Sequence, residues 1–237
     1  VLLTKGLSIV DNELTTLSDK IKYLLKKEGH SQINISAIKG PCLAAGLANK
    51  MRTGTVIANQ NVKESLLLKD MISTKYYSTE ISEDITGVEL SGAIKNIYSM
   101  LIGASEGLSN SKASKEIRSK YFLNTAASLI HRSISEMVEF VSYYGGKPET
   151  VYGLAGLGDL YVSAIGGRNS LMGKYLGEGH LYSDVKEKFM KDITIEGAQL
   201  ALEIGPRILE DLNSKNFPLM FSMLKAICEN KKLEIDW

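Results

Sequence analysis

Three short segments of the chain carry charged and polar residues of the types that bind and protonate small anionic substrates. They are Lys95-Asn96 in a helical apolar pattern, Asp159 after a glycine-rich run, and Arg168-Asn169 after two glycines. An ammonium group on a helix can polarise a ketone and protonate the alkoxide that develops from it. A guanidinium beside exposed backbone N–H groups suits phosphate oxygens. The three segments therefore suggest a site for a small anionic substrate.

Lys95 is the strongest catalytic candidate. The apolar stripe of its helix consists of Leu90, Ile94, Ile97 and Leu101, and Lys95 lies off this stripe. Its helical neighbours Ser91, Gly92 and Ser99 are small and leave room for a ligand or another backbone. Glycine inside a helix costs roughly 1 kcal/mol relative to alanine, so Gly92 calls for an explanation. The alternative is that Lys95 is a solvated surface lysine and that Asn96 is a surface or capping residue.

Asp159 ends the glycine-rich run Gly153–Asp159, whose spacing is G-x-x-G-x-G. Closely spaced glycines allow tight turns and the close approach of a partner. In a functional interpretation, Asp159 binds substrate hydroxyls or orients Lys95 and keeps that lysine charged. Alternatively, Asp159 caps a helix, or the run is a dinucleotide loop. The spacing does not match a nucleotide fingerprint, and no clear strand-to-helix unit surrounds it.

Arg168 and Asn169 follow Gly166-Gly167 and resemble an anion-binding corner. The alternative is a surface turn before a helix at Leu171, with Asn169 or Ser170 as its N-cap. Lys5-Gly6 and the segment Gly40–Ala44 are weaker signals. Each follows a predicted strand, where open α/β sheets gather their ligands, and each could equally be an ordinary turn.

Composition excludes several classes of protein. The chain has 237 residues, a formal charge of +1 and 44% hydrophobic residues, which argues against a nucleic-acid binder. It contains no apolar run of roughly 20 residues that would span a membrane. Two distant cysteines favour a reducing, cytoplasmic location. The three histidines lack metal-ligand spacing, so no metal site is expected. The start at Val1 resembles the middle of a longer protein.

Hydrophobic periodicity predicts two domains and an α/β fold class. Residues 1–84 alternate helices with strands and are expected to be the remainder of a dinucleotide-binding, doubly wound α/β domain. Residues 85–237 are expected to form an all-α domain that binds substrate and carries catalysis. The predicted strands are Val1–Thr4, Ile33–Ile38, Gly54–Ala58 and Tyr76–Thr79. The predicted helices include Leu14–Lys27, a segment ending at Gly145-Gly146, and the segments near 171–177, 183–190, 197–213 and 218–229.

The order and spacing of these segments resemble the NAD(P)-dependent sn-glycerol-3-phosphate dehydrogenases across essentially the whole chain. The motifs that carry the resemblance are Thr4–Leu7, Gly40–Ala44, Gly87–Asn96, Gly153–Asn169, Glu196-Gly197 and Phe217–Met220. The most diagnostic parts are Glu-Leu-x-Gly-Ala-x-Lys-Asn and Gly-Leu-Gly-Asp-Leu. The resemblance implies the C-terminal part of a Rossmann-like domain, followed by a helical domain like that of 6-phosphogluconate dehydrogenase.

The resemblance also implies a role for each site residue. Lys95 would be the general acid/base, with Lys5 near substrate and nicotinamide lowering the pKa of Lys95. Asn96 and Asp159 would hold the hydroxyl end of the substrate. Arg168 and Asn169 would bind its phosphate, and Gly40 and Cys42 would border it. The residues implied at the cofactor, NAD or NADP, are Lys5, Ala44, Arg168 and Glu196.

Three departures from the family pattern bear on function. Cys42 stands where the family usually has Ser or Thr, and Gly167 stands where bacterial relatives commonly have Ser. No G-x-G-x-x-G occurs in the 237 residues, so poor dinucleotide binding by this polypeptide is expected.

The expected reaction interconverts dihydroxyacetone phosphate and sn-glycerol 3-phosphate and supplies phospholipid synthesis. The alternatives are another hydroxy-acid dehydrogenase of the superfamily, or a truncated fragment that binds substrate without catalysis. The expected partner is a phosphorylated triose, with a possible homodimer and with no nucleic acid or membrane span.

Overall fold

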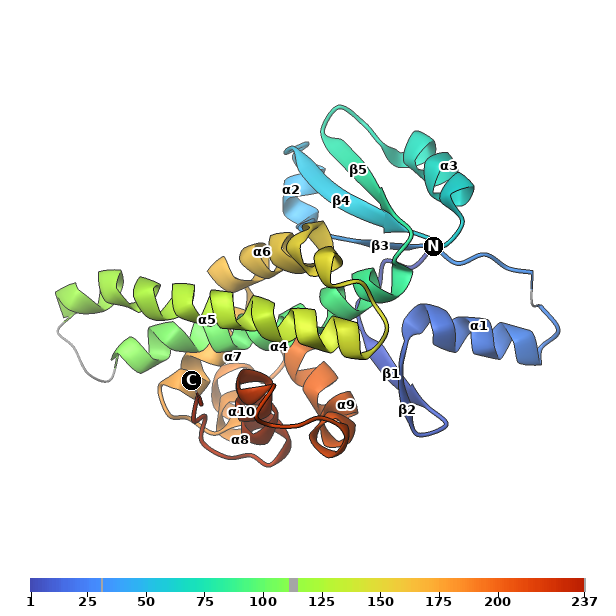
Figure 1. The fold of residues 1–237 in the computed structure, drawn as a ribbon. Coiled ribbons are helices and arrows are strands. Elements are labelled where there is room, and N and C mark those ends of the chain that lie inside the picture. Colours follow the sequence, from blue (N-terminus) through green and yellow to red (C-terminus); the bar gives the residue numbers. More distant parts are fainter. Residues whose placement is uncertain (31, 111–114, 237) are drawn as a thin grey trace. The chain divides into compact units, whose positions relative to one another are not determined.

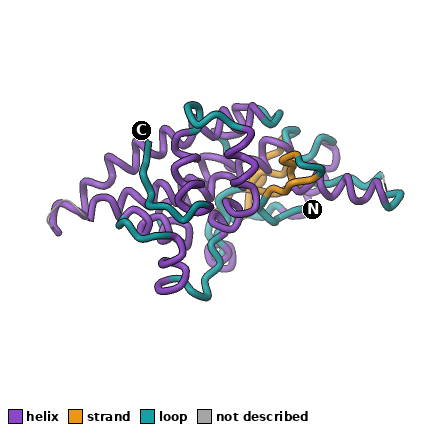
Figure 2. Tube along the Cα trace, turned by 90° about the horizontal axis from the view of Figure 1, so that it is seen from below, coloured by secondary structure: helices purple, strands orange, loops and turns teal. Residues whose placement is uncertain are grey.

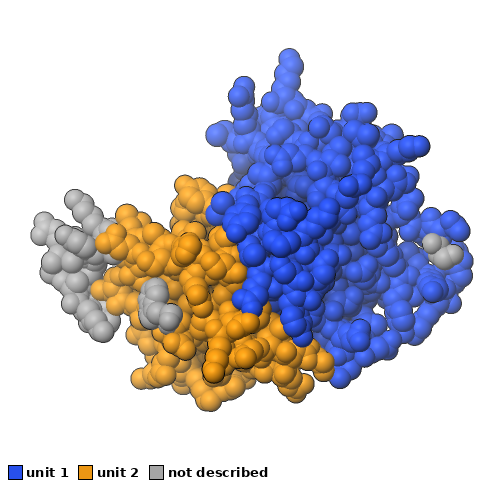
Figure 3. All heavy atoms as spheres, viewed as in Figure 1, with its two compact units in different colours: residues 1–93, 137–159 blue, residues 94–136, 160–237 orange. Residues whose placement is uncertain are grey.

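A computed structural model describes residues 1–30, 32–110 and 115–236. The chain divides into two compact units (Figure 3). Unit 1 comprises residues 1–93 and 137–159, and unit 2 comprises residues 94–136 and 160–237. The units follow packing rather than sequence order, so the predicted domain boundary after residue 84 stays a prediction.

Helices dominate the described residues, and strands occur only before residue 84 (Figures 1 and 2). The first elements are β1 (Leu7–Val10), β2 (Glu13–Thr16), α1 (Leu17–Lys27), β3 (Ala37–Lys39), α2 (Ala44–Ala48), β4 (Thr53–Ala58), α3 (Val62–Ile72) and β5 (Tyr77–Ser82). Two long helices follow, α4 (Ile85–Asn110) and α5 (Lys115–Tyr143). The remaining elements are η1 (Pro148–Tyr152), η2 (Leu154–Gly158), α6 (Asp159–Ile165), α7 (Arg168–Gly177), α8 (Tyr182–Asp184), η3 (Val185–Phe189), α9 (Glu196–Asp211) and α10 (Pro218–Cys228).

A three-stranded sheet of order β3-β4-β5 organises unit 1. Strands β4 and β5 are parallel and are joined by α3, whereas β3 runs antiparallel to β4. The predicted strands at β4 and β5 are confirmed, and β3 overlaps only the end of the predicted Ile33–Ile38 strand. The predicted strand Val1–Thr4 is wrong, because only Leu2 bridges the sheet, in parallel to Ala37. The expected α/β fold class, with a small sheet followed by helices, is confirmed.

The hairpin β1-β2 was not expected from the sequence. Asp11 and Asn12 form its two-residue turn with φ of 50° and 68°, the left-handed backbone that such turns require. The predicted helix start at Leu14 is therefore wrong, since Leu14 pairs with Ile9 in the hairpin. Helix α1 begins at Leu17, where the Thr16 hydroxyl accepts a hydrogen bond from the Asp19 N–H.

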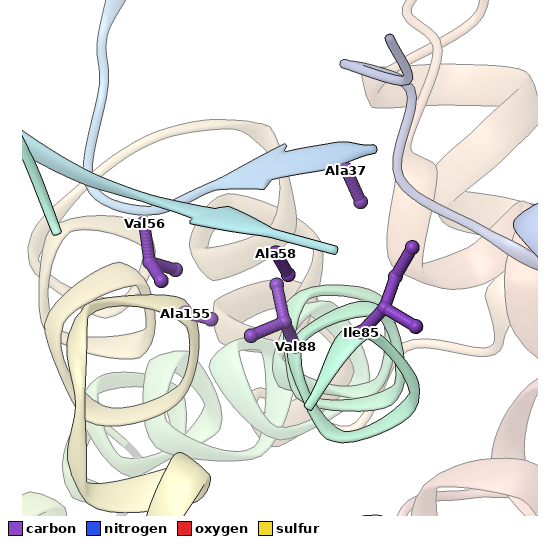
Figure 4. Close-up of a cluster of buried hydrophobic side chains, with 6 residues drawn as sticks. All are labelled: Ala37, Val56, Ala58, Ile85, Val88 and Ala155. Atoms are coloured by element: carbon purple, nitrogen blue, oxygen red, sulfur yellow. The ribbon is translucent and has the colours of Figure 1, made fainter. Parts of the chain in front are cut away.

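A compact hydrophobic cluster joins the sheet of unit 1 to the first turns of α4. Figure 4 shows it, with Ile85 and Val88 from α4, Ala155 from η2, and three residues from the strands, Ala37, Val56 and Ala58. All six side chains are nearly or fully buried. Burial of this apolar surface fixes the start of α4 against β3 and β4.

Asp84 connects the start of α4 with the segment that leads into the second glycine-rich motif. One carboxylate oxygen accepts a hydrogen bond from the Gly87 N–H at 2.9 Å. The other accepts from the Lys147 N–H at 2.9 Å and from the Thr150 hydroxyl at 2.6 Å. A Cβ at Gly87 would lie 1.9 Å from this carboxylate, so only glycine fits there. The glycine that opens the first motif thus serves the fold of unit 1.

In unit 2, α4 and α7 cross at backbone contact through two pairs of glycines. A Cβ at Gly173 would lie 1.8 Å from the carbonyl oxygen of Met100. A Cβ at Gly103 or Gly107 would lie within 2.3 Å of a carbonyl oxygen of α7, and one at Gly177 would lie 2.3 Å from an oxygen of α4. The G-x-x-x-G spacing on both helices allows this approach, which side chains would prevent.

The helices predicted in the second half of the chain are found at α7, α8 with η3, α9 and α10. Gly145, with φ of 83°, follows the end of α5 as expected for a helix stop. Within residues 1–30, 32–110 and 115–236, no helix has the length and apolarity needed to cross a bilayer.

Candidate active site

A cluster of four charged residues lies in unit 1, and we call it the charged cluster: Lys5, Lys39, Glu89 and Asp159. The ammonium of Lys5 lies 2.5 Å from a carboxylate oxygen of Asp159. The Lys5 side chain is 26% exposed and that of Asp159 only 4%. Two residues that the sequence assigns to substrate binding therefore form an ion pair that keeps one end open to solvent. The predicted orientation of Lys95 by Asp159 stays a prediction.

Lys39, which the sequence analysis did not select, is the most buried lysine of this cluster, at 2% exposure. Its Nζ donates hydrogen bonds to the carbonyl oxygens of Thr4 at 2.8 Å and, more weakly, of Leu2 at 3.4 Å. Burial is the main cause that lowers the pKa of Lys39 to about 8; the charges of Glu89 and Asp159 oppose this shift, and that of Lys5 adds to it. Its position at the end of β3, directly before Gly40-Pro41, is the only sequence signal that could have found it.

The pKa of Lys39 predicts a pH-dependent part of stability. In the unfolded chain this lysine keeps its proton until about pH 10.4. Above about pH 8 the unfolded state therefore binds more protons than the folded state, and stability rises with pH. We expect the free energy of unfolding of the natural chain to increase relative to that of Lys39→Met as the pH is raised from about 7.5 to about 9.5. Urea denaturation at both pH values measures this.

Lys63 on α3 supplies the matched control, because its side chain is exposed. The Lys63→Met variant should follow the natural chain at both pH values. If the free energies of unfolding of the natural chain and Lys39→Met differ by the same amount at both pH values, Lys39 releases no proton in this range.

Glu89 and Gly92, on the first turns of α4, flank the stem of Lys39. The carboxylate of Glu89 accepts from the Ser18 N–H, with both oxygens at 3.3 Å, and burial raises its pKa. A Cβ at Gly92 would lie 3.2 Å from two stem carbons of Lys39. The glycine in the helix interior thus leaves room for a second lysine of the charged cluster.

The segment Gly40–Ala44 begins in tight contact with β4. Gly40 has φ of 139°, and a Cβ there would lie 3.0 Å from the Cα of Thr55. The Cys42 N–H donates to the Gly40 carbonyl oxygen at 2.9 Å, and burial raises the pKa of the Cys42 thiol, which the charge of Lys5 partly offsets. Ala44 begins α2 and is exposed. Burial thus favours the neutral form of the Cys42 thiol.

In unit 2, Lys95 is buried at 3% exposure, so the alternative of a solvated surface lysine is wrong. Its Nζ donates a hydrogen bond to the hydroxyl of Ser163 on α6. Ser163 was not among the predicted site residues, although it lies one helical turn after Asp159 on the same helix. A buried ammonium next to a hydroxyl is a proton donor held in a fixed place.

Asn96 and Asn169 join three helices of unit 2 in what we call the asparagine network. The Nδ2 of Asn169 donates to the Oδ1 of Asn96 at 3.1 Å, and the Oδ1 of Asn169 accepts from the Gly197 N–H at 2.9 Å. A Cβ at Gly197 would lie 2.6 Å from the carbonyl oxygen of Asn96. The residue after Lys95 is thus fixed to the starts of α7 and α9.

Arg168 is the first residue of α7, and Gly167, with φ of 110°, is its N-cap. The predicted turn with a helix start at Leu171 is therefore wrong. The guanidinium of Arg168 lies 3.0 Å from the carboxylate of Glu196, and the two side chains are 53% and 52% exposed. An exposed ion pair stabilises a protein by at most about 1 kcal/mol, so an anionic ligand can readily replace Glu196 as the partner of the guanidinium. Across the ranges that the structure describes, no group of three or more histidine, cysteine or acidic side chains gathers as metal ligands.

Comparisons with known proteins find one consistent family. The model described as NAD-dependent glycerol-3-phosphate dehydrogenase C-terminus matches residues 84–235. The NADP(+)-dependent glycerol-3-phosphate dehydrogenase of Archaeoglobus fulgidus is 30% identical over 236 residues, covering 99% of this chain and 67% of its own length. Glycerol-3-phosphate dehydrogenase [NAD(P)+] of Lawsonia intracellularis is 31% identical over 190 residues, covering 78% of this chain and 50% of its own length.

A solved structure agrees with these relatives. The crystal structure of glycerol-3-phosphate dehydrogenase from Coxiella burnetii matches with a TM-score of 0.76 at 28% identity. The match covers 97% of this chain and 64% of the crystallised one. The chain thus spans between half and two thirds of the length of these relatives.

Proposed function

Because the chain belongs to the family of NAD-dependent glycerol-3-phosphate dehydrogenases, we propose that its protein interconverts dihydroxyacetone phosphate and sn-glycerol 3-phosphate with NAD or NADP. The observation that supports this most directly lies in unit 2. There, the buried Lys95 is followed by Asn96, whose side chain bonds to Asn169 beside the exposed guanidinium of Arg168. A proton donor and an anion-binding residue are thus connected through the asparagine network.

In this proposal Lys95 moves the proton at the substrate oxygen on C2. When bound, the nicotinamide supplies the hydride for reduction and accepts it in the reverse direction. As the hydride adds to C2 of dihydroxyacetone phosphate, the electron pair of the carbonyl moves to oxygen, and the ammonium of Lys95 donates the proton that completes the alcohol. In the reverse direction the neutral amine of Lys95 takes that proton. Ser163 keeps the Nζ of Lys95 in place.

Each unit has its own polar groups that suit a phosphorylated substrate. Arg168 offers its planar fork to the phosphate, and the amide of Asn169 fixes the asparagine network beside it. The Oδ1 of Asn96 accepts from Asn169, and its Nδ2 group supplies donors for a substrate hydroxyl. The ion pair of Lys5 with Asp159 offers both a donor and an acceptor to the same class of ligand.

The residues assigned to the cofactor fit an anionic dinucleotide in part. Arg168 and Glu196 stand exposed in the first turns of α7 and α9, and Ala44 is exposed at the start of α2. The guanidinium of Arg168 suits phosphate and the carboxylate of Glu196 suits hydroxyl groups, but no G-x-G-x-x-G to bind a pyrophosphate occurs in these 237 residues. For a polypeptide of this sequence alone, the second candidate function is therefore substrate binding without hydride transfer.

The direct test is calorimetric titration of the chain with sn-glycerol 3-phosphate. We expect measurable binding at millimolar ligand, and we expect Arg168→Met to weaken it by roughly 10- to 100-fold, since hydrogen bonds to charged groups are worth about 1.5–3 kcal/mol. Glycerol, which lacks the phosphate, should not distinguish the two proteins. Turnover of dihydroxyacetone phosphate by the full-length gene product, with NADH and with NADPH, then separates the enzyme from a protein that only binds.

Arg52 provides the control for this titration, because it is an exposed arginine outside the residues assigned to the site. The Arg52→Met variant should bind like the natural chain. No binding by the natural chain at millimolar ligand would contradict a preformed phosphate site. Turnover of another hydroxy acid in place of the triose would favour the other superfamily dehydrogenases.

A role in supplying glycerol phosphate to phospholipid synthesis follows from this activity and belongs to the same proposal. The predicted homodimer and the predicted cytoplasmic location stay predictions. The phosphorylated triose is the substrate class that we assign to the protein.

A further inference from the structure

We propose that Lys39 is a positioning residue that fixes Lys5 beside Asp159 through the main chain of residues 2–5. The inference rests on the proposed function, because it assigns Lys39 to the binding of the same substrate. The contacts of Lys39 within unit 1 carry it. The sequence resemblance assigned no role to this lysine.

The ammonium group of Lys39 is placed next to the peptide that precedes Lys5. Lys39 is 2% exposed, yet its Nζ donates to the carbonyl oxygen of Thr4 at 2.8 Å. Thr4 directly precedes Lys5, so this bond fixes the peptide from which the Lys5 side chain extends. Hydrogen bonds from a charged donor are stronger than those from a neutral donor, so a single side chain can anchor this segment.

The main-chain contacts of residues 2–5 with the sheet occur at Leu2. Leu2 is held by two main-chain hydrogen bonds, from its N–H to the Ser36 carbonyl at 2.7 Å and from the Ile38 N–H to its own carbonyl at 2.9 Å. The Nζ of Lys39 donates a hydrogen bond to the carbonyl oxygen of Thr4, two residues beyond this bridge. The lysine thus extends the anchoring of the segment from the sheet to the residue next to Lys5.

Helix α4 approaches the stem of Lys39 closely. The absence of a side chain at Gly92 leaves space for the stem of Lys39, because a Cβ at Gly92 would lie 3.2 Å from two carbons of that stem. Glu89, one turn earlier on α4, supplies an opposite charge to Lys39. Space beside Gly92 and the opposite charge of Glu89 on α4 therefore both favour this placement of the Lys39 side chain.

A double-mutant cycle on the affinity for sn-glycerol 3-phosphate tests the proposal. We expect Lys5→Met to weaken binding by roughly tenfold or more, and Lys39→Met to weaken it in the same direction. If Lys39 acts through Lys5, the double variant should bind within about twofold of Lys5→Met alone, because the two effects share one group. Multiplicative losses would mean that Lys39 acts independently of Lys5, and they would overturn the proposal.

A second measurement reports on Lys5 without any ligand. Acylation of lysines under native conditions, read by mass spectrometry, gives the labelling rate of Lys5 in the natural chain and its variants. We expect Lys39→Met to raise this rate by roughly tenfold, because the segment loses a charged hydrogen bond. Lys63→Met on α3 is the control and should leave the rate unchanged. An unchanged rate in Lys39→Met would overturn the positioning role.

If Lys39→Met does not fold, Gly92→Ala carries the same labelling test. It keeps every polar side chain and adds a Cβ 3.2 Å from two stem carbons of Lys39, which must shift, so Lys5 should again label faster than in the natural chain; an unchanged rate overturns the proposal. If the natural chain binds no sn-glycerol 3-phosphate, the proposed function fails, whereas the labelling rates still decide whether Lys39 holds Lys5.

Discussion

Replacing Lys95 with methionine is expected to lower the turnover of dihydroxyacetone phosphate by roughly a thousandfold in the full-length gene product, because general acid catalysis contributes about 10²–10⁴-fold. Methionine keeps the length and the apolar stem of this buried side chain but removes the proton donor. Cofactor affinity should change little, since Lys95 is assigned to the substrate oxygen. Steady-state kinetics with saturating cofactor measure the loss as a fall in kcat.

Two variants of unit 2 sharpen this experiment. Lys225→Met removes an exposed lysine from α10 and should leave turnover unchanged. Ser163→Ala removes the hydroxyl that accepts from Lys95 and should lower turnover less than the loss of Lys95 itself. Turnover of Lys95→Met within about tenfold of the natural enzyme would remove Lys95 from the chemical step.

Replacing Gly173 with valine is expected to destabilise the chain by about 3 kcal/mol or more, at the upper end of the cost of overpacking. A Cβ at this position would lie 1.8 Å from the carbonyl oxygen of Met100, which is backbone and cannot rotate away. Helices α4 and α7 must then separate. Denaturation of the chain by urea measures the change as a lower midpoint with a similar slope.

Separation of α4 and α7 should also disrupt the asparagine network. Asn96 on α4 and Asn169 on α7 are joined at 3.1 Å, so moving the helices apart breaks this bond and weakens the affinity for sn-glycerol 3-phosphate. Gly166→Ala is the matched control, because nothing lies within 4 Å of a Cβ there, and its stability should stay within about 0.5 kcal/mol of the natural chain. Equal stability of Gly173→Val and Gly166→Ala would contradict the close crossing.

Local pattern determined much of this protein from the sequence alone. The spacing of Leu90, Ile94, Ile97 and Leu101 predicted the helix that carries Lys95, because a buried helix face repeats with the helical period whatever its partner is. The order of the short motifs indicated the family, because a given chemistry requires particular residue types at fixed separations. The hairpin turn Asp11-Asn12 was not predicted, because its sequence signal is only two residues long.

Only the tertiary structure decided what each of these residues contacts. Nothing in the sequence near Lys39 shows that its ammonium reaches Thr4, or that Gly92 makes room for its stem, since these residues are 35 and 53 positions away. The physical reason is that burial and pairing depend on groups brought together by packing between elements, while periodicity reports only on the element itself. The sequence alone thus indicated most of the candidate side chains, whereas packing added Lys39 and Ser163 and decided that Lys5 pairs with Asp159 and Asn96 with Asn169.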